Sequence, residues 1–180
     1  MHSDILKVLF NEEELKAKTR ELADKISEEY KNKEILAITV LKGSFIFAAD
    51  LLRAMSIPTS IDFMVLSSYG SSTQTSGVVK IVKDLEYDIS GKDILIIEDI
   101  LDSGMTLSYL KKILETRGAK SIKICTILNK PDRRKADITA DYVGFDIPDE
   151  FVVGYGLDYN EKYRNLPYVG ILKREIYENN

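Results

Sequence analysis

Hydrophobic and polar residues follow two different periods along the chain, one typical of helices and one typical of buried strands. Asn11 and Glu14 resemble a capping box, and Leu15, Leu22 and Ile26 follow at helical spacing, which predicts a helix that runs to residue 30. Short apolar runs instead predict strands, several of them covered on both faces. These runs occupy residues 34–41, 61–69, 93–97 and 121–128, and residues 76–85 alternate.

Segments with a helical period lie between the predicted strands. One occupies residues 43–55, and Leu107, Leu110 and Leu114 mark another that closes at Gly118. Strands that alternate with helices of this length predict a parallel sheet with helices on both faces, and ligands in such folds bind at the carboxyl ends of the strands. The predicted fold class is therefore α/β, with a central and mainly parallel sheet.

The pattern changes beyond residue 130. Residues 141–173 contain short apolar pieces, turn residues and many tyrosines without a helical period, which predicts a small antiparallel appendage. We therefore expect one domain over residues 1–180, with a core over roughly residues 1–130 and an appendage over roughly residues 131–180. Residues 67–77, SSYGSSTQTSG, are small and polar, so they form either an inert linker or a mobile lid. Composition alone favours the linker.

Composition narrows the class of protein. The 180 residues are 44% hydrophobic and 30% charged, which fits one domain with a sizeable core. The formal net charge of -4 argues against binding to nucleic acid or to a membrane surface, although a small anion could still be held locally. No apolar run approaches the length of a membrane span, and the first residues lack the pattern of a signal peptide. We expect a cytoplasmic protein.

Cysteine and histidine are scarce, which limits the chemistry. Cys125 lies in an apolar run, so we expect it to be a core residue. Because it is the only cysteine, it forms no intrachain disulfide. His2 is the only histidine and stands next to the start of the sequence. Proton transfer would therefore fall to carboxylates, lysines or tyrosines.

Two common phosphate-binding motifs are absent. The only Gly-Lys pair, Gly91 and Lys92, precedes Asp93 and does not form a Walker loop. The segment GYGLDY, residues 154–159, has Tyr159 where a dinucleotide fingerprint needs its third glycine.

The segment DSGMT, residues 102–106, lies between a predicted strand and a predicted helix. Backbone N–H groups at a helix N-terminus favour an anion, and Ser103 and Thr106 add hydroxyl donors. Alternatively, Asp102 or Ser103 only caps the helix, and for this segment taken alone we favour capping.

Glu98 and Asp99 change that balance. Consecutive strand residues point to opposite faces, so two acids at the end of a buried strand would both be exposed at the crevice. Acids beside an anion site suit a ligand that also offers hydroxyl groups or a magnesium ion. A sugar phosphate meets both requirements.

Five segments together resemble one family. ILIIEDILDSGMTL, residues 94–107, resembles the phosphoribosyl pyrophosphate signature of type I phosphoribosyltransferases. VLKGSFIFAADL (40–51) is similar to that family's pyrophosphate loop, and residues 67–77 are similar to its mobile lid. LNKPDRR (128–134) is similar to its base-recognition segment, and residues 149–170 are similar to its purine hood. The resemblance covers nearly the whole chain and is greatest to the bacterial hypoxanthine-guanine members. Ser103 departs from the threonine of many members but keeps the hydroxyl.

The resemblance implies a type I phosphoribosyltransferase fold with a C-terminal antiparallel hood, and a role for each matched residue. In the implied reaction a purine displaces pyrophosphate from the ribose of phosphoribosyl pyrophosphate and forms a nucleoside monophosphate. Glu98 and Asp99 would hold the ribose hydroxyls, and Asp102 would exchange the purine proton. The 5′-phosphate would contact Ser103, Gly104, Met105 and Thr106.

The remaining matched residues would bind the pyrophosphate and the base. Lys42, preceded by a cis peptide bond in this family, would bind pyrophosphate with Gly43 and Arg164. An exposed surface arginine would look the same in sequence. Lys130, Phe151, Val152 and Asp158 would contact the purine, although Phe151 and Val152 without the resemblance suggest a plain core pair. Ser68 and Tyr69 would belong to the lid.

The resemblance also implies a cofactor and partners. The cofactor would be Mg²⁺, with Asp158 as its ligand together with Glu98 and Asp99. The substrates would be phosphoribosyl pyrophosphate with hypoxanthine or guanine, and the assembly a homodimer or homotetramer. Three alternatives remain at this point: a phosphoribosyltransferase for xanthine or a pyrimidine, a non-catalytic regulator that binds nucleotides or RNA, and a phosphoacceptor signalling domain.

Overall fold

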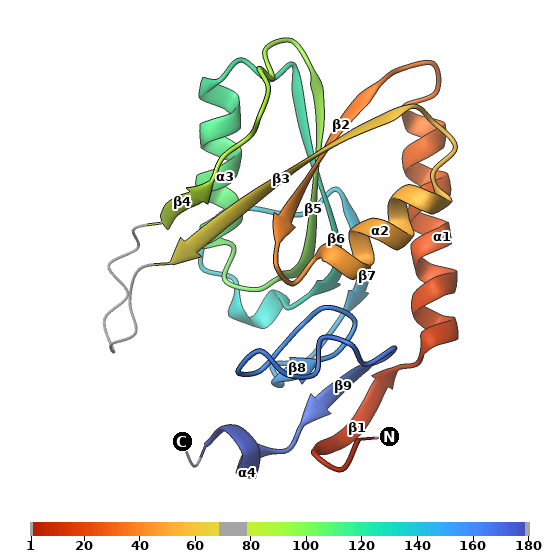
Figure 1. Ribbon diagram of the computed structural model, residues 1–180, viewed down its shortest axis with the longest axis vertical. Helices are drawn as coiled ribbons and strands as arrows, with labels where there is room; N and C mark the ends of the chain where they lie inside the picture. Colours follow the sequence, from red (N-terminus) through yellow and green to blue (C-terminus); the bar gives the residue numbers. More distant parts are fainter. Residues whose placement is uncertain (1, 69–78, 179–180) are drawn as a thin grey trace.

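The computed structural model describes residues 2–68 and 79–178, which form two sheets (Figure 1). The large sheet has the strand order β4-β3-β2-β5-β6-β7, and the small sheet has the order β1-β9-β8. The strands are β1 (Ile5–Phe10), β2 (Ile35–Leu41), β3 (Thr59–Ser68), β4 (Val79–Lys83), β5 (Asp93–Leu101), β6 (Ser121–Asn129), β7 (Tyr142–Asp146), β8 (Val152–Val153) and β9 (Val169–Leu172).

The large sheet is mainly parallel, as predicted. Strand β2 lies between β3 and β5, and Ile38 is in register with Asp62 on one side and Ile96 on the other. Strands β6 and β7 continue the parallel pairing beyond β5, and only β4 runs antiparallel to its neighbour. The carboxyl ends of the parallel strands therefore meet at one edge.

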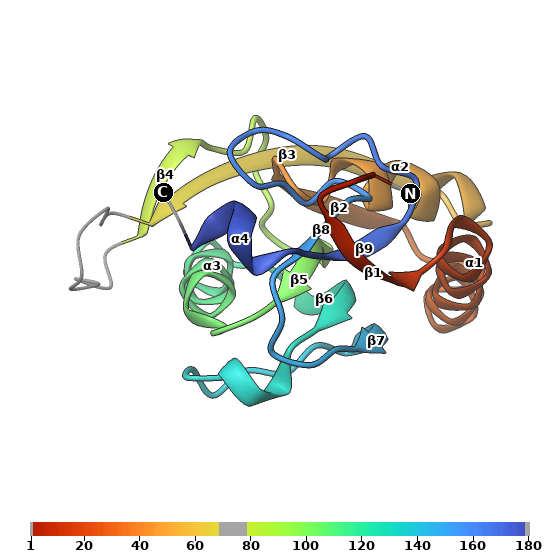
Figure 2. The same ribbon diagram turned by 90° about the horizontal axis from the view of Figure 1, so that it is seen from below.

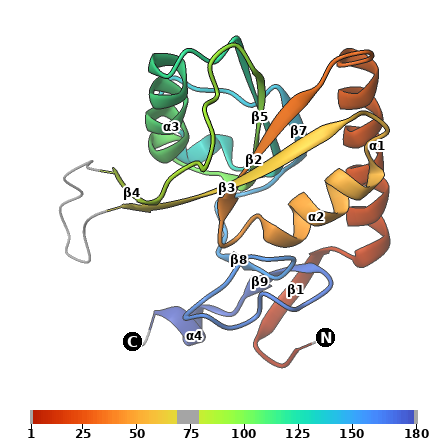
Figure 3. The ribbon, with the colours of Figure 1, turned by 45° about the horizontal axis from the view of Figure 1, so that its top comes forward.

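Helices cover both faces of this sheet, on opposite sides in Figure 3. They are α1 (Glu12–Glu29), α2 (Phe45–Ala54) and α3 (Met105–Thr116), whereas α4 (Arg174–Tyr177) packs with the small sheet and a 3₁₀ turn occupies Pro131–Arg133. Side chains of β5 alternate between the faces: Leu95 and Ile97 pack in the cluster with α1 and α2, whereas Ile94 and Ile96 pack with α3. Among the described residues, no helix is both long and apolar enough to cross a membrane.

Helix α1 begins where its capping signal predicts. The N–H of Glu14 donates to the side chain of Asn11 at 3.0 Å, and the N–H of Asn11 donates to the Glu14 carboxylate at 2.8 Å. Leu15, Leu22 and Ile26 are buried, so the helical spacing marks the face that packs in the core.

The predicted boundary between core and appendage is wrong in two places. Residues 142–146 form β7, a parallel strand of the large sheet, although we assigned them to the antiparallel appendage. Strand β1 pairs with β9 and so belongs to the small sheet, although we assigned it to the core. Both errors arise from pairing between distant residues, which local patterns do not reveal. Figure 2 views the molecule from the side of the small sheet, with α4 beside it.

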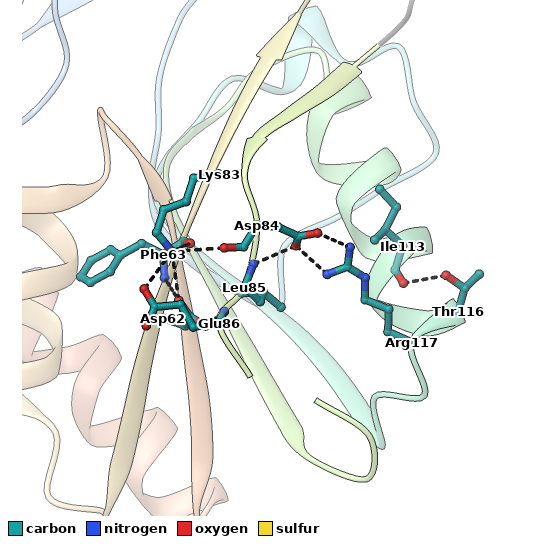
Figure 4. A network of polar contacts seen from close by, with 9 residues as sticks. All are labelled: Asp62, Phe63, Lys83, Asp84, Leu85, Glu86, Ile113, Thr116 and Arg117. Atoms are coloured by element: carbon teal, nitrogen blue, oxygen red, sulfur yellow. Dashed lines mark hydrogen bonds and ion pairs between the residues drawn. The ribbon is translucent and has the colours of Figure 1, made fainter. Parts of the chain in front are cut away.

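The edge strand β4 is fastened to its surroundings by ion pairs (Figure 4). The carboxylate of Asp84, just after β4, accepts two hydrogen bonds of 2.6 Å from the guanidinium of Arg117 near the end of α3. These bonds lower the pKa of Asp84. Asp62 on β3 is buried, and its carboxylate accepts the N–H of Glu86 at 2.8 Å and lies 3.6 Å from the ammonium of Lys83. These contacts hold β4 and the loop behind it against β3 and α3.

Candidate active site

The small sheet covers the edge at which β2, β5 and β6 end. Gly156 lies so close to the end of β2 that an added Cβ would stand 2.0 Å from the carbonyl oxygen of Gly43. Lys130, just after β6, donates from its ammonium to the carbonyl of Glu150 at 2.8 Å and from its N–H to the carbonyl of Leu101 at 3.0 Å. The predicted base, phosphate and pyrophosphate segments therefore meet at one place.

Glu98 and Asp99 lie within β5 rather than at its end, which corrects our prediction. The strand continues because Ile100 and Leu101 restore the apolar pattern and stay in register with β6. Glu98 is only 9% exposed. Burial raises the pKa of both carboxyls, and the adjacent Asp99 raises the pKa of Glu98 further. A hydroxyl donor or a cation would stabilise the charged forms of this pair.

Asp102 presents an unsatisfied oxygen. Its Oδ1 is buried and has no hydrogen-bond partner among the described residues, and the guanidinium of Arg133 approaches it only to 3.6 Å. Unpaired buried polar atoms are rare in folded proteins, so this oxygen is positioned for a donor that the protein itself does not supply.

The loop before α3 leaves the start of that helix open. Gly104 precedes the helix with φ +77°, and within the described part of the chain no side chain caps α3. The Ser103 hydroxyl lies 3.5 Å from the N–H of Met105, at the limit of a hydrogen bond. Asp102 therefore does not cap the helix and Ser103 makes only this one long bond to it, so the first N–H groups of α3 can bind an anion.

Arg134 fixes this loop from behind, which the sequence did not indicate. Its guanidinium donates to the carbonyls of Asp102 at 2.9 Å, Leu101 at 3.2 Å and Ile138 at 2.6 Å, and to the side chain of Asn129 at 2.6 Å. Nothing in the run of charged residues around it distinguishes this arginine from a solvated one.

The segment after β2 contains the cis peptide bond that the resemblance implied, between Leu41 and Lys42. An added Cβ on Gly43 would stand 1.6 Å from Oδ2 of Asp99. The hydroxyl of Ser44 donates to the carbonyl of Val40 at 2.5 Å. The end of β2 therefore packs directly against the acids of β5.

Lys42 and Arg164 come together through a residue that we did not predict. The carboxylate of Glu161 lies 2.9 Å from the ammonium of Lys42 and 3.3 Å from the guanidinium of Arg164. Arg164 also contacts Asp158 at 2.9 Å and donates to the carbonyl of Gly156 at 2.9 Å. In sequence, Glu161 looks like any exposed acid of a turn.

Phe151 and Val152 differ in exposure. Phe151 is 37% exposed and its ring stacks on that of Tyr177, with the ring centroids 4.9 Å apart. Its interpretation as a core residue is therefore wrong, whereas Val152 is buried and pairs with Ile171. Lys130 is 5% exposed, so its ammonium is held within the protein beside this strand.

The remaining predicted residues are only partly placed. Ser68 is the last residue of β3, and Tyr69 lies outside the described residues, as does most of the predicted lid. Over residues 2–68 and 79–178, no three acids gather into a group that could hold a metal ion by themselves. Glu98, Asp99 and Asp158 thus do not form a complete metal site without ligand oxygens.

Comparison with known proteins links this geometry to one family. A family model described as "Phosphoribosyl transferase domain" matches residues 7–160. The hypoxanthine-guanine phosphoribosyltransferase of Bacillus subtilis is 58% identical over 178 residues, which are 99% of each chain. The bifunctional protein TilS/HprT of Listeria monocytogenes is 55% identical over 98% of this chain but only 27% of its own length. A crystal structure of a Staphylococcus aureus hypoxanthine phosphoribosyltransferase superimposes with a TM-score of 0.95 at 50% identity, covering 98% of this chain and 96% of that one.

Proposed function

This chain belongs to the phosphoribosyltransferase family, and on that premise we propose that it transfers the 5-phosphoribosyl group of phosphoribosyl pyrophosphate to hypoxanthine or guanine. A purine ring nitrogen bonds to the anomeric carbon while the bond to pyrophosphate breaks. Pyrophosphate leaves with the electron pair, the purine gives up one proton, and the product is IMP or GMP.

The observation that carries this proposal is Oδ1 of Asp102, which is buried and accepts no hydrogen bond from the described residues. Along the chain, Asp102 stands between Leu101, whose carbonyl accepts the N–H of Lys130, and the turn at the start of α3, which suits a phosphate. A purine N–H would supply the missing donor, and the carboxylate could accept that proton as the new bond forms. Arg134 holds the carbonyl of Asp102 and so keeps this carboxylate in place.

Glu98 and Asp99 would act on the sugar. Positive charge develops on the ribose in the transition state, and two carboxylates in a buried site stabilise such charge more strongly than they would in water. Ribose hydroxyls would donate to them and stabilise their ionised forms.

The phosphate groups would be bound at two places. Ser103, Gly104, Met105 and Thr106 form the turn at the start of α3 and would hold the 5′-phosphate. Lys42, the backbone at Gly43 and Arg164 would hold pyrophosphate, to which a guanidinium can donate two parallel hydrogen bonds.

The acids of the site also suit Mg²⁺. Magnesium in proteins commonly takes one or two carboxylates and fills its other positions with phosphate oxygens and water, so the lack of a three-acid group among the described residues is no obstacle. Asp158, with Glu98 and Asp99, would hold the ion, which would neutralise the leaving pyrophosphate.

Lys130 would select the base. A buried ammonium can donate to the 6-oxo oxygen of hypoxanthine or guanine, whereas adenine presents another donor there. Sites built around such a hydrogen bond discriminate by about 10,000-fold. Phe151, supported by Tyr177, would stack on the purine ring, and Val152 would contact its edge.

The test is a base panel assayed with phosphoribosyl pyrophosphate and Mg²⁺. Hypoxanthine and guanine should release pyrophosphate and form their monophosphates, while adenine, which has no 6-oxo oxygen, and uracil should react far more slowly. If neither hypoxanthine nor guanine is converted, the proposal is refuted.

Asp102→Asn tests the proton acceptor separately. Turnover should fall by about 100-fold to 10,000-fold, because the amide cannot accept the proton, while binding of phosphoribosyl pyrophosphate should remain close to that of the wild type. Undiminished turnover in this variant would contradict the role.

A homodimer or homotetramer remains our expectation for the assembly. Phe45 on α2 and Ile61 and Phe63 on β3 are exposed apolar side chains that a second copy could cover. Light scattering after gel filtration would give the mass in solution, and a monomeric mass would contradict the expectation.

A further inference from the structure

A two-residue turn carries Glu161 to the pyrophosphate side of the site. The N–H of Tyr159 donates to the carbonyl of Lys162 at 3.2 Å, and the N–H of Lys162 donates back to Tyr159 at 3.0 Å. Between them, Asn160 and Glu161 have φ values of +51° and +59°. Turns with two left-handed central residues favour Asn followed by Gly, so glutamate is an unfavourable residue at the second position.

The side chain of Glu161 accounts for its presence there. One oxygen lies 2.9 Å from the Lys42 ammonium, and the other lies 3.3 Å from the Arg164 guanidinium. Hydrogen bonding, first of all from Lys42, lowers the pKa of Glu161. A carboxylate thus stands between two cations that come from opposite sides of the site.

We propose that Glu161 is an internal competitor of pyrophosphate: it neutralises Lys42 and Arg164, has to leave both when pyrophosphate binds, and thereby weakens the binding of that group. This inference rests on the proposed function, in which Lys42 and Arg164 bind pyrophosphate. Its consequence for catalysis is faster release of pyrophosphate, which otherwise would be held by two cations and a metal ion.

The geometry makes this displacement easy. The side chains of Lys42 and Glu161 are each 64% exposed, and ion pairs at such positions are weak. Arg164 keeps its contacts with Asp158 and with the carbonyl of Gly156 when Glu161 leaves, so the guanidinium stays in position. Glu161 can therefore move away without dismantling the rest of the site.

The test measures the binding of inorganic pyrophosphate with Mg²⁺ by calorimetry. Glu161→Gln removes the charge and should tighten pyrophosphate binding about three- to ten-fold, since one competing anion and its repulsion are lost. Glu161→Gly also relieves the left-handed backbone and should tighten binding at least as much. Glu115→Gln removes the same charge from an exposed position late in α3 and should leave the affinity unchanged.

A purely structural role for Glu161 predicts the opposite sign. Loss of a supporting ion pair would disorder Lys42 and Arg164 and weaken pyrophosphate binding, and that result, or an unchanged affinity, would overturn the inference. In turnover assays, product inhibition by pyrophosphate should set in at correspondingly lower concentrations in Glu161→Gln. The binding measurement needs no purine, so a failure of the base panel would refute the proposed function without deciding this inference.

Discussion

Replacement of Gly43 by alanine should damage the site through a single methyl group. The added Cβ would stand 1.6 Å from Oδ2 and 2.7 Å from Cγ of Asp99, whereas real Cβ contacts stay beyond 3.0 Å, so one partner has to move by about 1.4 Å. Rotation of Asp99 would disturb the 2.7 Å hydrogen bond that its Oδ1 accepts from the N–H of Ile100. The loop cannot easily retreat, because Gly156 packs against the Gly43 carbonyl.

The expected magnitudes follow from this geometry. Overpacking of this kind costs about 1–3 kcal/mol, which for a chain of this length lowers Tm by roughly 2–12 °C. Displacement of a catalytic carboxylate by about 1 Å costs roughly 100-fold in rate, so kcat/KM for phosphoribosyl pyrophosphate should fall by about that factor.

Thermal unfolding and steady-state kinetics on two variants would decide the matter. Gly91→Ala is the matched control: Gly91 has φ +74° but no atom within 4 Å of an added Cβ. It should lose about 1–2 kcal/mol of stability to backbone strain and keep its turnover. A Gly43→Ala protein with wild-type Tm and wild-type kcat/KM would refute the close packing of this loop on Asp99.

Substitutions at three further residues test other parts of the molecule. Lys130→Met keeps the length of the side chain but removes the hydrogen-bond donor. KM for hypoxanthine should therefore rise about 100-fold or more, while phosphoribosyl pyrophosphate binds as before. Equal losses for both substrates would contradict a role in base selection. Tyr177→Ala removes the ring that stacks on Phe151 and should raise KM for the base about three- to ten-fold with little change in kcat. Tyr177→Phe keeps a ring and should restore the wild-type KM. A KM that stays high in Tyr177→Phe would show that ring stacking is not the cause. Because Arg117 lowers the pKa of Asp84 below its ordinary 3.8, their pair stabilises the fold above about pH 3.8 and loses that effect as the pH falls through the folded-state pKa. Asp84→Asn should therefore lower the free energy of unfolding at pH 7 by less than about 1 kcal/mol, since Asp84 is 46% exposed, and so lower Tm slightly. The difference from the wild type should shrink in acid, and a difference that grows in acid would contradict the pairing.

Local patterns predicted α1, α2 and α3 and the strands β2 to β6, because burial leaves a pattern in the sequence, whereas α4 and β1 were not predicted. Helix α1 shows this well, since its capping box and its buried stripe were both visible in sequence. Strand β5 was predicted too short because Glu98 and Asp99 interrupt its apolar run, and only the surrounding protein explains how two acids continue a buried strand.

The candidate site was predicted where a motif names its residues and missed where contacts decide. Asp102 and the turn at Gly104 lie in a recognisable segment. Arg134 acts through bonds to carbonyls, and every residue has a carbonyl, so no pattern marks its partners. Glu161 acts on Lys42, which is 119 residues away along the chain. Such pairings depend on the folded arrangement alone.

The pairing of β1 with β9 also determines when the protein can be completed during its synthesis. Ile5 is in register with Leu172, and a ribosome that adds about 5–20 residues per second delivers the second roughly 8 to 30 seconds after the first. Until then β1 has no partner strand, and its apolar residues and open backbone edge are exposed to other chains. Strands β2 to β7 are all available by residue 146, so the large sheet can form before β8 and β9 leave the ribosome. Val152, which we propose contacts the purine, therefore enters the small sheet only after the turn before α3, which we propose holds the 5′-phosphate, has been able to form.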